Sequence, residues 1–294
     1  MRYRTLGGEL RVSAIGLGAM PLSIEGHPDE HQGLATLHAA LDAGVTLIDT
    51  ADSYHPPGGA PGPGELLVRR ALAAYGGDTD SVVVATKGGR GRTPDGGWTV
   101  NGDPAHLKRA ARDSLARLGV GAIGLYQLHK PDPAVPYADS LGALHELLSE
   151  GTIRFAGISN ADTEQILLAR EVLGDRLVSV QNRYSPEVRD SEAELRLCAQ
   201  LGLAFLPWSP LGGISRSSLD GPSALAGTRP YAAFHDVARE RGASPQQVAL
   251  AWLLAKSPTV IPIPGASRPL SIRDSAAAAD LVLSEAELAA LETA

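Results

Sequence analysis

The sequence is poor in the residues that mark several other classes of protein. Among its 294 residues there is one cysteine, Cys198, so no disulfide can form within the chain and a reducing compartment is expected. Basic residues are not in excess: the formal net charge is −7, whereas nucleic-acid-binding proteins usually carry a basic face. No apolar signal segment stands at the N-terminus, and the longest apolar run, residues 248–255, is too short to span a bilayer. These absences favour a cytoplasmic protein that binds neither nucleic acid nor membrane.

Hydrophobic residues make up 44 % of the chain, which is enough for a sizeable core. A hairpin is expected over residues 2–12, with Gly7 and Gly8 at its turn. Short apolar strands then alternate with helical patterns along the chain, without a break in composition. The expected strands are residues 14–20, 46–49, 82–86, 125–128, 155–159, 177–181, 204–208 and 259–263.

Eight strand–helix units in this length predict an α/β fold, a (β/α)8 TIM barrel with an N-terminal β-hairpin, as a single domain over residues 1–294. The alternative is a doubly wound open sheet. Its dinucleotide fingerprint is missing, because Pro21 stands where the third glycine would be. Residues 88–102, which include Trp98, are expected to form a long loop.

Capping residues mark three of the expected helix starts. Asp103 precedes a proline at the first helical position, and so does Ser244. Ser244 and Ser284 are each followed three residues later by Gln247 and Glu287, the spacing of a capping box.

Polar side chains stand where several predicted strands end. Asp49 ends the second strand, Lys87 follows the third and His129 follows the fourth, while Tyr54 comes five residues after Asp49. Each residue alone has an ordinary structural explanation, such as a loop cap, a solvated lysine, a hydrogen-bonded histidine or a packed aromatic. In a parallel barrel, however, these strand ends meet at one rim, where active sites lie. The four residues together therefore indicate a catalytic site.

Several segments resemble those of the aldo-keto reductases, in the order and at the spacing of that family. They are residues 16–20, 49–54, 85–87, 127–129, 157–160, 180–184, 207–212 and 263–267. The resemblance implies an NAD(P)H-dependent oxidoreductase that reduces an aldehyde or ketone, a small carbonyl substrate, to an alcohol. It leaves the identity of the substrate and the oligomeric state open.

The resemblance also implies roles for the four residues at the strand ends. Tyr54 would donate the proton, Lys87 would be the cation beside it, and Asp49 would anchor Lys87. A phenol has a pKa of about 10 when unperturbed, and a nearby cation is expected to lower it. His129 would orient the substrate carbonyl, and Trp98 would share the substrate pocket with Tyr54 and His129.

Cofactor contacts follow from the same resemblance, with NADP(H) preferred over NAD(H). Ser159, Asn160 and Gln181 would bind the nicotinamide carboxamide, and Trp208 would stack on the ring. The further cofactor positions are Gly18, Ala19, Met20, Asp49, Ser209, Pro210, Leu211, Gly212, Gly265, Ser267, Arg268 and Ser271. An arginine at a helix start suits the 2′-phosphate, although Ser271 and Ser275 are shorter than the residues found in many relatives.

No metal site is expected. His27 and His31 are separated by Pro28, which breaks any helix that would align them. Two other functions remain as alternatives to a reductase. One is a cofactor-binding, redox-sensing regulatory subunit with vestigial turnover, and the other is a barrel enzyme with lyase or isomerase chemistry.

Overall fold

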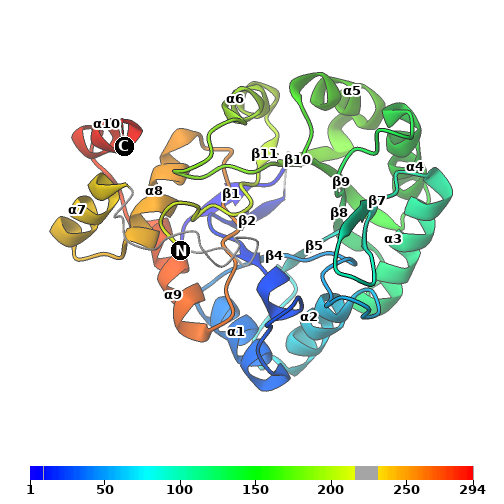
Figure 1. The fold of residues 1–294 in the computed structure, drawn as a ribbon, viewed down its shortest axis with the longest axis horizontal. Coiled ribbons are helices and arrows are strands. Elements are labelled where there is room, and N and C mark those ends of the chain that lie inside the picture. The colour runs from blue at the N-terminus through cyan, green and yellow to red at the C-terminus, as the bar shows by residue number, and fades with distance from the viewer. Residues whose placement is uncertain (9, 216–230, 294) are drawn as a thin grey trace.

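The computed structural model describes residues 1–8, 10–215 and 231–293. A curled sheet of seven parallel strands forms its centre, in the order β11-β10-β9-β8-β5-β4-β3, and helices surround it (Figure 1). The strands are β3 Leu17–Gly18, β4 Leu47–Asp49, β5 Val83–Gly88, β8 Ile123–Leu128, β9 Ile153–Ser159, β10 Leu177–Gln181 and β11 Ala204–Phe205. The prediction of a TIM-barrel α/β fold is confirmed.

The predicted eighth strand, residues 259–263, is wrong as a regular strand, although the segment does join the two edges of the sheet. On one side it forms a parallel bridge to Phe205 of β11. On the other, the amide of Gly16 donates to the carbonyl of Pro262 at 2.9 Å, and just beyond the segment the amide of Gly18 donates to the carbonyl of Pro264 at 2.9 Å. Pro262 and Pro264 have no N–H to give, so this segment cannot complete a strand ladder.

The helices lie outside the sheet and shield its apolar strands from water. They are α1 Glu30–Asp42, α2 Pro63–Ala74, α3 Pro104–Leu118, α4 Tyr137–Ser149, α5 Thr163–Leu173, α6 Glu192–Leu201, α7 Ala232–Arg241, α8 Pro245–Lys256, α9 Pro269–Ala277 and α10 Glu285–Glu292. Helices α7 and α10 lie together to one side of the barrel, at the left of Figure 1. No helix in the described ranges is long and apolar enough to cross a membrane.

The predicted helix starts differ in how completely they are capped. Asp103 accepts a hydrogen bond from the amide of His106, as expected for an N-cap. Ser284 and Glu287 form a complete capping box. Ser244 accepts from the amide of Gln247, but the Gln247 side chain donates to a residue of α9 instead of closing the box. The capping box predicted at Ser244 is therefore half formed.

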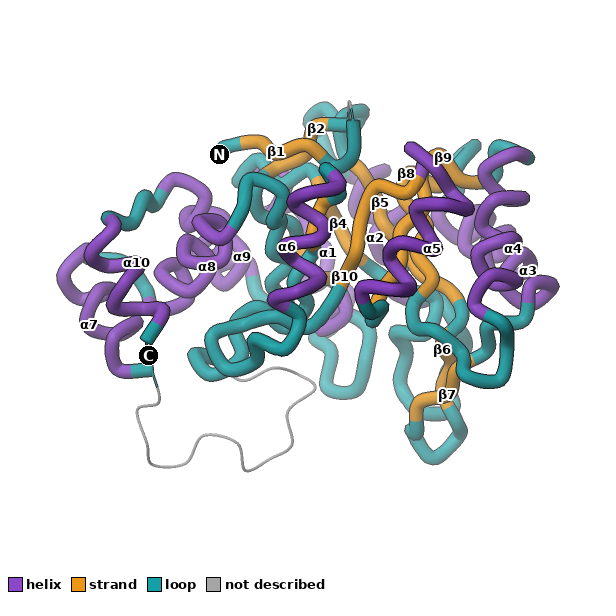
Figure 2. Tube along the Cα trace, turned by 90° about the horizontal axis from the view of Figure 1, so that it is seen from above, coloured by secondary structure: helices purple, strands orange, loops and turns teal. Residues whose placement is uncertain are grey.

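Two small antiparallel hairpins lie at opposite ends of the barrel (Figure 2). The N-terminal hairpin was predicted and is formed by β1 Tyr3–Thr5 and β2 Arg11–Ser13. Leu6 and Val12 of this hairpin are fully buried and pack into the barrel interior. The second hairpin, β6 Arg90–Arg92 with β7 Trp98–Val100, lies within residues 88–102, where a loop was predicted. That prediction is wrong, because an Arg-Gly-Arg strand carries no apolar alternation to reveal it.

Candidate active site

A cavity of about 610 Å³ lies at the carboxyl ends of the strands. Nearly all residues predicted for catalysis, substrate and cofactor line it. These are Gly18, Met20, Asp49, Tyr54, Trp98, His129, Ser159, Asn160, Gln181, Trp208, Ser209, Pro210, Leu211, Gly212, Gly265, Ser267, Arg268 and Ser271. The other two, Lys87 and Ala19, do not reach the cavity surface: both are buried, and Lys87 lies beneath Tyr54 and Asp49.

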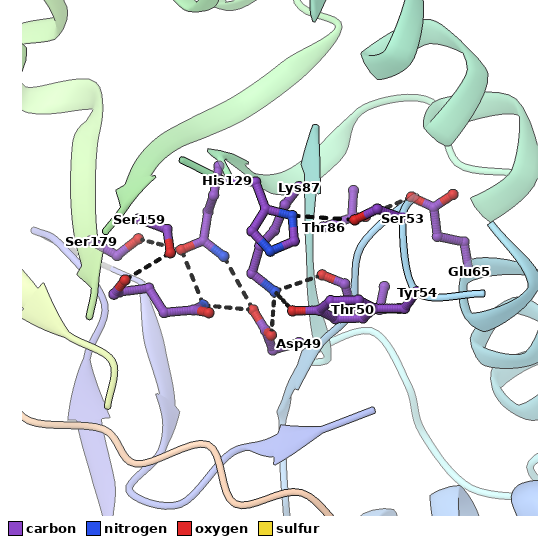
Figure 3. Close-up of polar contacts among 12 residues, drawn as sticks. Asp49, Thr50, Ser53, Tyr54, Glu65, Thr86, Lys87, His129, Ser159 and Ser179 are labelled. Carbon is purple, nitrogen blue, oxygen red and sulfur yellow. Dashed lines mark hydrogen bonds and ion pairs between the residues drawn. The ribbon is translucent and has the colours of Figure 1, made fainter. Parts of the chain in front are cut away.

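Lys87 is the centre of the polar cluster below the cavity (Figure 3). Its Nζ donates to Asp49 Oδ1 at 2.5 Å, to Tyr54 Oη at 3.0 Å and to the carbonyl of Thr50 at 2.9 Å. All three partners come from β4 and the loop after it, whereas Lys87 comes from the neighbouring strand β5. Parallel pairing of β4 with β5 thus brings the ammonium group to the phenol and the carboxylate.

Asp49 is held by two amides in addition to Lys87. Gln127 Nε2 and Gln181 Nε2 donate to Asp49 Oδ2 at 3.1 and 2.8 Å. Gln127 was not among the predicted site residues, although it is a polar residue within an otherwise apolar strand, in register with Lys87. Because the NH2 group of Gln181 faces Asp49, only its carbonyl oxygen is left to meet a cofactor.

Burial and charge act in opposite directions on the phenol and the amine. Burial raises the pKa of Tyr54 above its usual value, although Lys87 opposes the shift. The expected lowering by the cation is therefore present but outweighed. Burial alone would lower the pKa of Lys87, but the Asp49 carboxylate and the Tyr54 phenol together raise it. At neutral pH Tyr54 keeps its proton and Lys87 keeps its charge.

His129 is a neutral imidazole at the cavity wall. Burial, followed by the charges of Lys87 and Arg90, holds its pKa well below the usual range. The ring meets Tyr54 edge-on, with centroids 5.6 Å apart. Its Nδ1 lies 3.4 Å from Ser53 Oγ. When this hydroxyl donates to Nδ1, Nε2 carries the proton and can donate a hydrogen bond.

Two residues of the cavity wall have a left-handed backbone although they are not glycine. They are Asn160, with φ 58°, and Ser209, with φ 48°. Asn160 follows β9, and its Nδ2 donates to the carbonyl of His129 at 2.9 Å. Ser159 Oγ donates to the carbonyl of Gln181 at 2.7 Å. Such conformations persist where the surroundings impose them, and they concentrate at ligand-binding sites.

The far end of the cavity lies along α9 and carries charges of both signs. Arg268 is the residue before this helix, and its side chain forms no ion pair or hydrogen bond among the described residues. Asp274, which was not predicted, also lines this end and accepts from Ser244 Oγ and Gln247 Nε2, both at 2.7 Å. A free guanidinium at a helix N-terminus fits an anion such as a phosphate.

Beneath the loop between Asp49 and Tyr54 lies a further buried carboxyl group, Asp52. Its Oδ1 has no hydrogen-bond partner among the described residues. Burial and the nearby Glu65 carboxylate raise the pKa of Asp52 to about 7, against the opposing charge of Arg117. Glu65 itself is satisfied by Thr86 and by Arg117. The sequence does not show that Asp52 is buried or that it lies near Glu65 and Arg117.

We expect Asp52→Asn to stabilise the protein, and more so at high pH. As the pH rises from about 4 to 7, the unfolded carboxyl group ionises first while the folded one keeps its proton, so the wild type loses stability over this window. The variant is free of this loss, and the gain in free energy of unfolding should reach about 1–4 kcal/mol at pH 8. Urea unfolding at pH 5 and pH 8 measures it. Asp190→Asn, at an exposed site, is the control, and an equal gain at both pH values would rule out titration of Asp52 as the cause.

Comparison with known proteins shows the family to which the chain belongs. Residues 14–294 match the family model of the Aldo/keto reductase family, and the chain belongs to this family. It is 35 % identical over 289 residues to an uncharacterized oxidoreductase of Schizosaccharomyces pombe, covering 97 % of this chain and 87 % of the relative. It is 34 % identical over 296 residues to the pyridoxine 4-dehydrogenase of Escherichia coli, covering 97 % and 96 %.

Solved structures show the same fold. An aldo/keto reductase from Klebsiella pneumoniae in complex with NADP and acetate superposes with a TM-score of 0.80 at 29 % identity, covering 100 % of this chain and 95 % of that one. The thermostable aldo-keto reductase Tm1743, in complex with the inhibitor epalrestat, superposes with a TM-score of 0.82 at 28 % identity, covering 100 % and 99 %. The chain is thus an oxidoreductase of the aldo-keto reductase type.

Proposed function

We propose that the chain, as one barrel domain, is an NADP(H)-dependent reductase that converts an aldehyde or ketone to an alcohol. The observation that carries the proposal is the contact of Lys87 Nζ with both Asp49 and Tyr54, at 2.5 and 3.0 Å, beneath a cavity lined by Tyr54 and His129. A protonated phenol beside a fixed cation is what reduction of a carbonyl requires from the protein.

In the proposed reaction, a bound nicotinamide would supply the hydride that the carbonyl carbon receives. Tyr54 gives its proton to the carbonyl oxygen, and Lys87 stabilises the phenolate that this leaves behind. Asp49 holds Lys87 in place and is itself fixed by Gln127 and Gln181. His129, through Nε2–H, donates a hydrogen bond to the carbonyl oxygen and polarises it.

The cofactor would lie across the cavity from Trp208 to α9. Ser159, the Asn160 side-chain oxygen and the Gln181 carbonyl oxygen would meet the nicotinamide carboxamide, with Trp208 against the ring. Residues 209–212 would carry the pyrophosphate and Arg268 the 2′-phosphate, which favours NADP(H) over NAD(H). The NADP bound by the Klebsiella pneumoniae reductase supports this preference. The Escherichia coli pyridoxine dehydrogenase supports chemistry between an alcohol and a carbonyl.

A fluorescence titration tests the cofactor assignment. NADPH should quench tryptophan emission, and Trp208→Leu should remove a large part of the quench, because Trp252 is fully buried outside the cavity lining and Trp98 lies on the hairpin at the other end of the cavity. NADPH should bind about 10- to 100-fold more tightly than NADH, and Arg268→Gln should remove most of this difference by weakening NADPH alone. The proposal fails if neither nucleotide binds, and the NADP(H) preference fails if Arg268→Gln weakens both equally.

A further inference from the structure

The hairpin β6–β7 places two arginines against one tryptophan at the cavity. Alternation along β6 puts Arg90 and Arg92 on the same face, and Trp98 pairs with Arg92 across the hairpin. Each guanidinium carbon lies 4.3 Å from the centroid of the Trp98 ring. Trp98 in turn packs against the apolar cluster that contains Tyr54. The hairpin therefore connects a pair of cations to the proton-donating end of the cavity.

The two arginines differ in how their charges are compensated. Arg92 forms an ion pair with Glu25 through both terminal nitrogens. Arg90 lines the cavity, and its side chain forms no ion pair or hydrogen bond with any residue that the structure describes. Its Nε is buried without a partner among the described residues, as is the Nε of Arg92, but only Arg90 of the two lines the cavity. A buried donor without an acceptor costs free energy, so the position of Arg90 favours a ligand that brings an acceptor with it.

The other ionisable side chains at this end of the cavity are either paired with an opposite charge or uncharged. Lys87 is neutralised by Asp49. His129 is neutral, since its pKa lies well below its usual value. Arg268 and Asp274 belong to the α9 end, and Figure 1 shows α9 and the hairpin on opposite sides of the barrel. Within the described part of the chain, Arg90 is thus the uncompensated charge that faces the substrate.

We propose that Arg90 binds an anionic group, a carboxylate or a phosphate, on the carbonyl substrate. This inference rests on the proposed function, because it assumes that the carbonyl lies at Tyr54 and His129. A planar guanidinium offers parallel N–H donors that match two oxygens of such a group. The guanidinium of Arg90 lies over the ring of Trp98, and its N–H groups have no acceptor among the described residues. The substrate class is accordingly an aldehyde or ketone that carries an acid group at some distance from the carbonyl.

Matched substrate pairs test the inference. One pair is 4-carboxybenzaldehyde and its methyl ester, which differ in charge at one position, and 3-carboxybenzaldehyde with its ester varies the distance. Glyceraldehyde 3-phosphate and glyceraldehyde form the phosphate pair. In at least one pair, the wild type should show a kcat/KM for the anion about 10- to 100-fold above that for the neutral partner. The pair with the larger ratio distinguishes a carboxylate from a phosphate.

Arg90→Gln should remove that ratio by lowering kcat/KM for the anion alone, whereas Arg90→Lys should keep part of it. Circular dichroism and urea unfolding show whether the variant is folded. The matched control is Arg92→Gln, which removes the other arginine on the same tryptophan and should leave the ratio as it is. An anion ratio near one in every wild-type pair, or an equal loss for both partners in Arg90→Gln, would overturn the inference.

A binding measurement separates this inference from the proposed function. Calorimetric titration with benzoate, and with benzamide as the neutral probe, requires no turnover. Benzoate binding that Arg90→Gln weakens about 10-fold or more would support the anion site even if no carbonyl compound were reduced. Reduction of neutral aldehydes without any Arg90-dependent preference for benzoate or for anionic substrates would leave the reductase standing and refute the role of Arg90.

Discussion

Tyr54→Phe should lower kcat for carbonyl reduction by about 10³-fold while NADPH still binds. A positioned general acid contributes on the order of 10² to 10⁴ in rate, and this substitution removes the phenolic oxygen alone. The ring keeps its packing, and Lys87 keeps its bonds to Asp49 and Thr50. Steady-state kinetics on a simple aldehyde, combined with the fluorescence titration of NADPH, separates the loss of chemistry from a loss of binding.

A partly buried tyrosine with a buried hydroxyl group provides the control for Tyr54. The hydroxyl of Tyr137 on α4 is buried without a hydrogen-bond partner among the described residues, and Tyr137 does not line the cavity. Tyr137→Phe should therefore leave kcat within about twofold, since it removes no bond. Full activity in Tyr54→Phe would exclude Tyr54 as the proton donor. Many turnovers by the wild type, in turn, would speak against a regulatory subunit that reacts once.

Lys87→Met should abolish turnover and also destabilise the fold. Lys87 is fully buried and its partner Asp49 is 3 % exposed, so the substitution leaves a buried carboxylate without its cation. Breaking one side of a buried pair costs about 3–5 kcal/mol. Urea unfolding monitored by circular dichroism measures this loss, and activity is compared under conditions in which the variant is still folded.

The double variant Asp49→Asn/Lys87→Met shows whether the loss comes from the pair. Removing both charges leaves neither one buried alone, so the double variant should be more stable than the sum of the single losses predicts, by about 1–3 kcal/mol. It should remain inactive, because the cation beside Tyr54 is still missing. Strictly additive losses of stability would show that Asp49 and Lys87 are not coupled.

The parts of the fold that could be predicted from the sequence are those determined by local chemistry. The caps at Asp103 and Ser284 could be predicted because each side chain accepts a hydrogen bond from a backbone amide only three residues further along the chain. Asp49 stands at a strand end, and the parallel topology alone brings it close to Lys87. The prediction of a regular eighth strand was wrong because Pro262 and Pro264 lack the backbone N–H groups that a strand ladder needs. The apolar character of the segment does not show this.

Other features of the site depend on pairing and burial that a sequence does not show. The β6–β7 hairpin is held by arginines stacked on Trp98, without an apolar alternation. Whether Arg90 or Arg92 has a free charge depends on the position of Glu25, about 65 residues away along the chain. The raised pKa of Tyr54 is the balance between desolvation and Lys87, and its sign follows from the three-dimensional surroundings. Gln127 is different: its place in an apolar strand was a signal that the sequence did contain.

The β6–β7 hairpin forms a sheet of its own, apart from the barrel sheet, and this arrangement affects how the substrate specificity can change. Among the described residues, the hairpin pairs only with itself and contributes no strand to the barrel sheet, whereas Asp49, Lys87 and Gln127 lie on strands of that sheet. On the roles proposed above, selection of the substrate and delivery of the proton belong to different structural units, which touch where Trp98 packs beside Tyr54. We expect that new specificities can be grafted or evolved at the hairpin while this contact and the reaction are preserved.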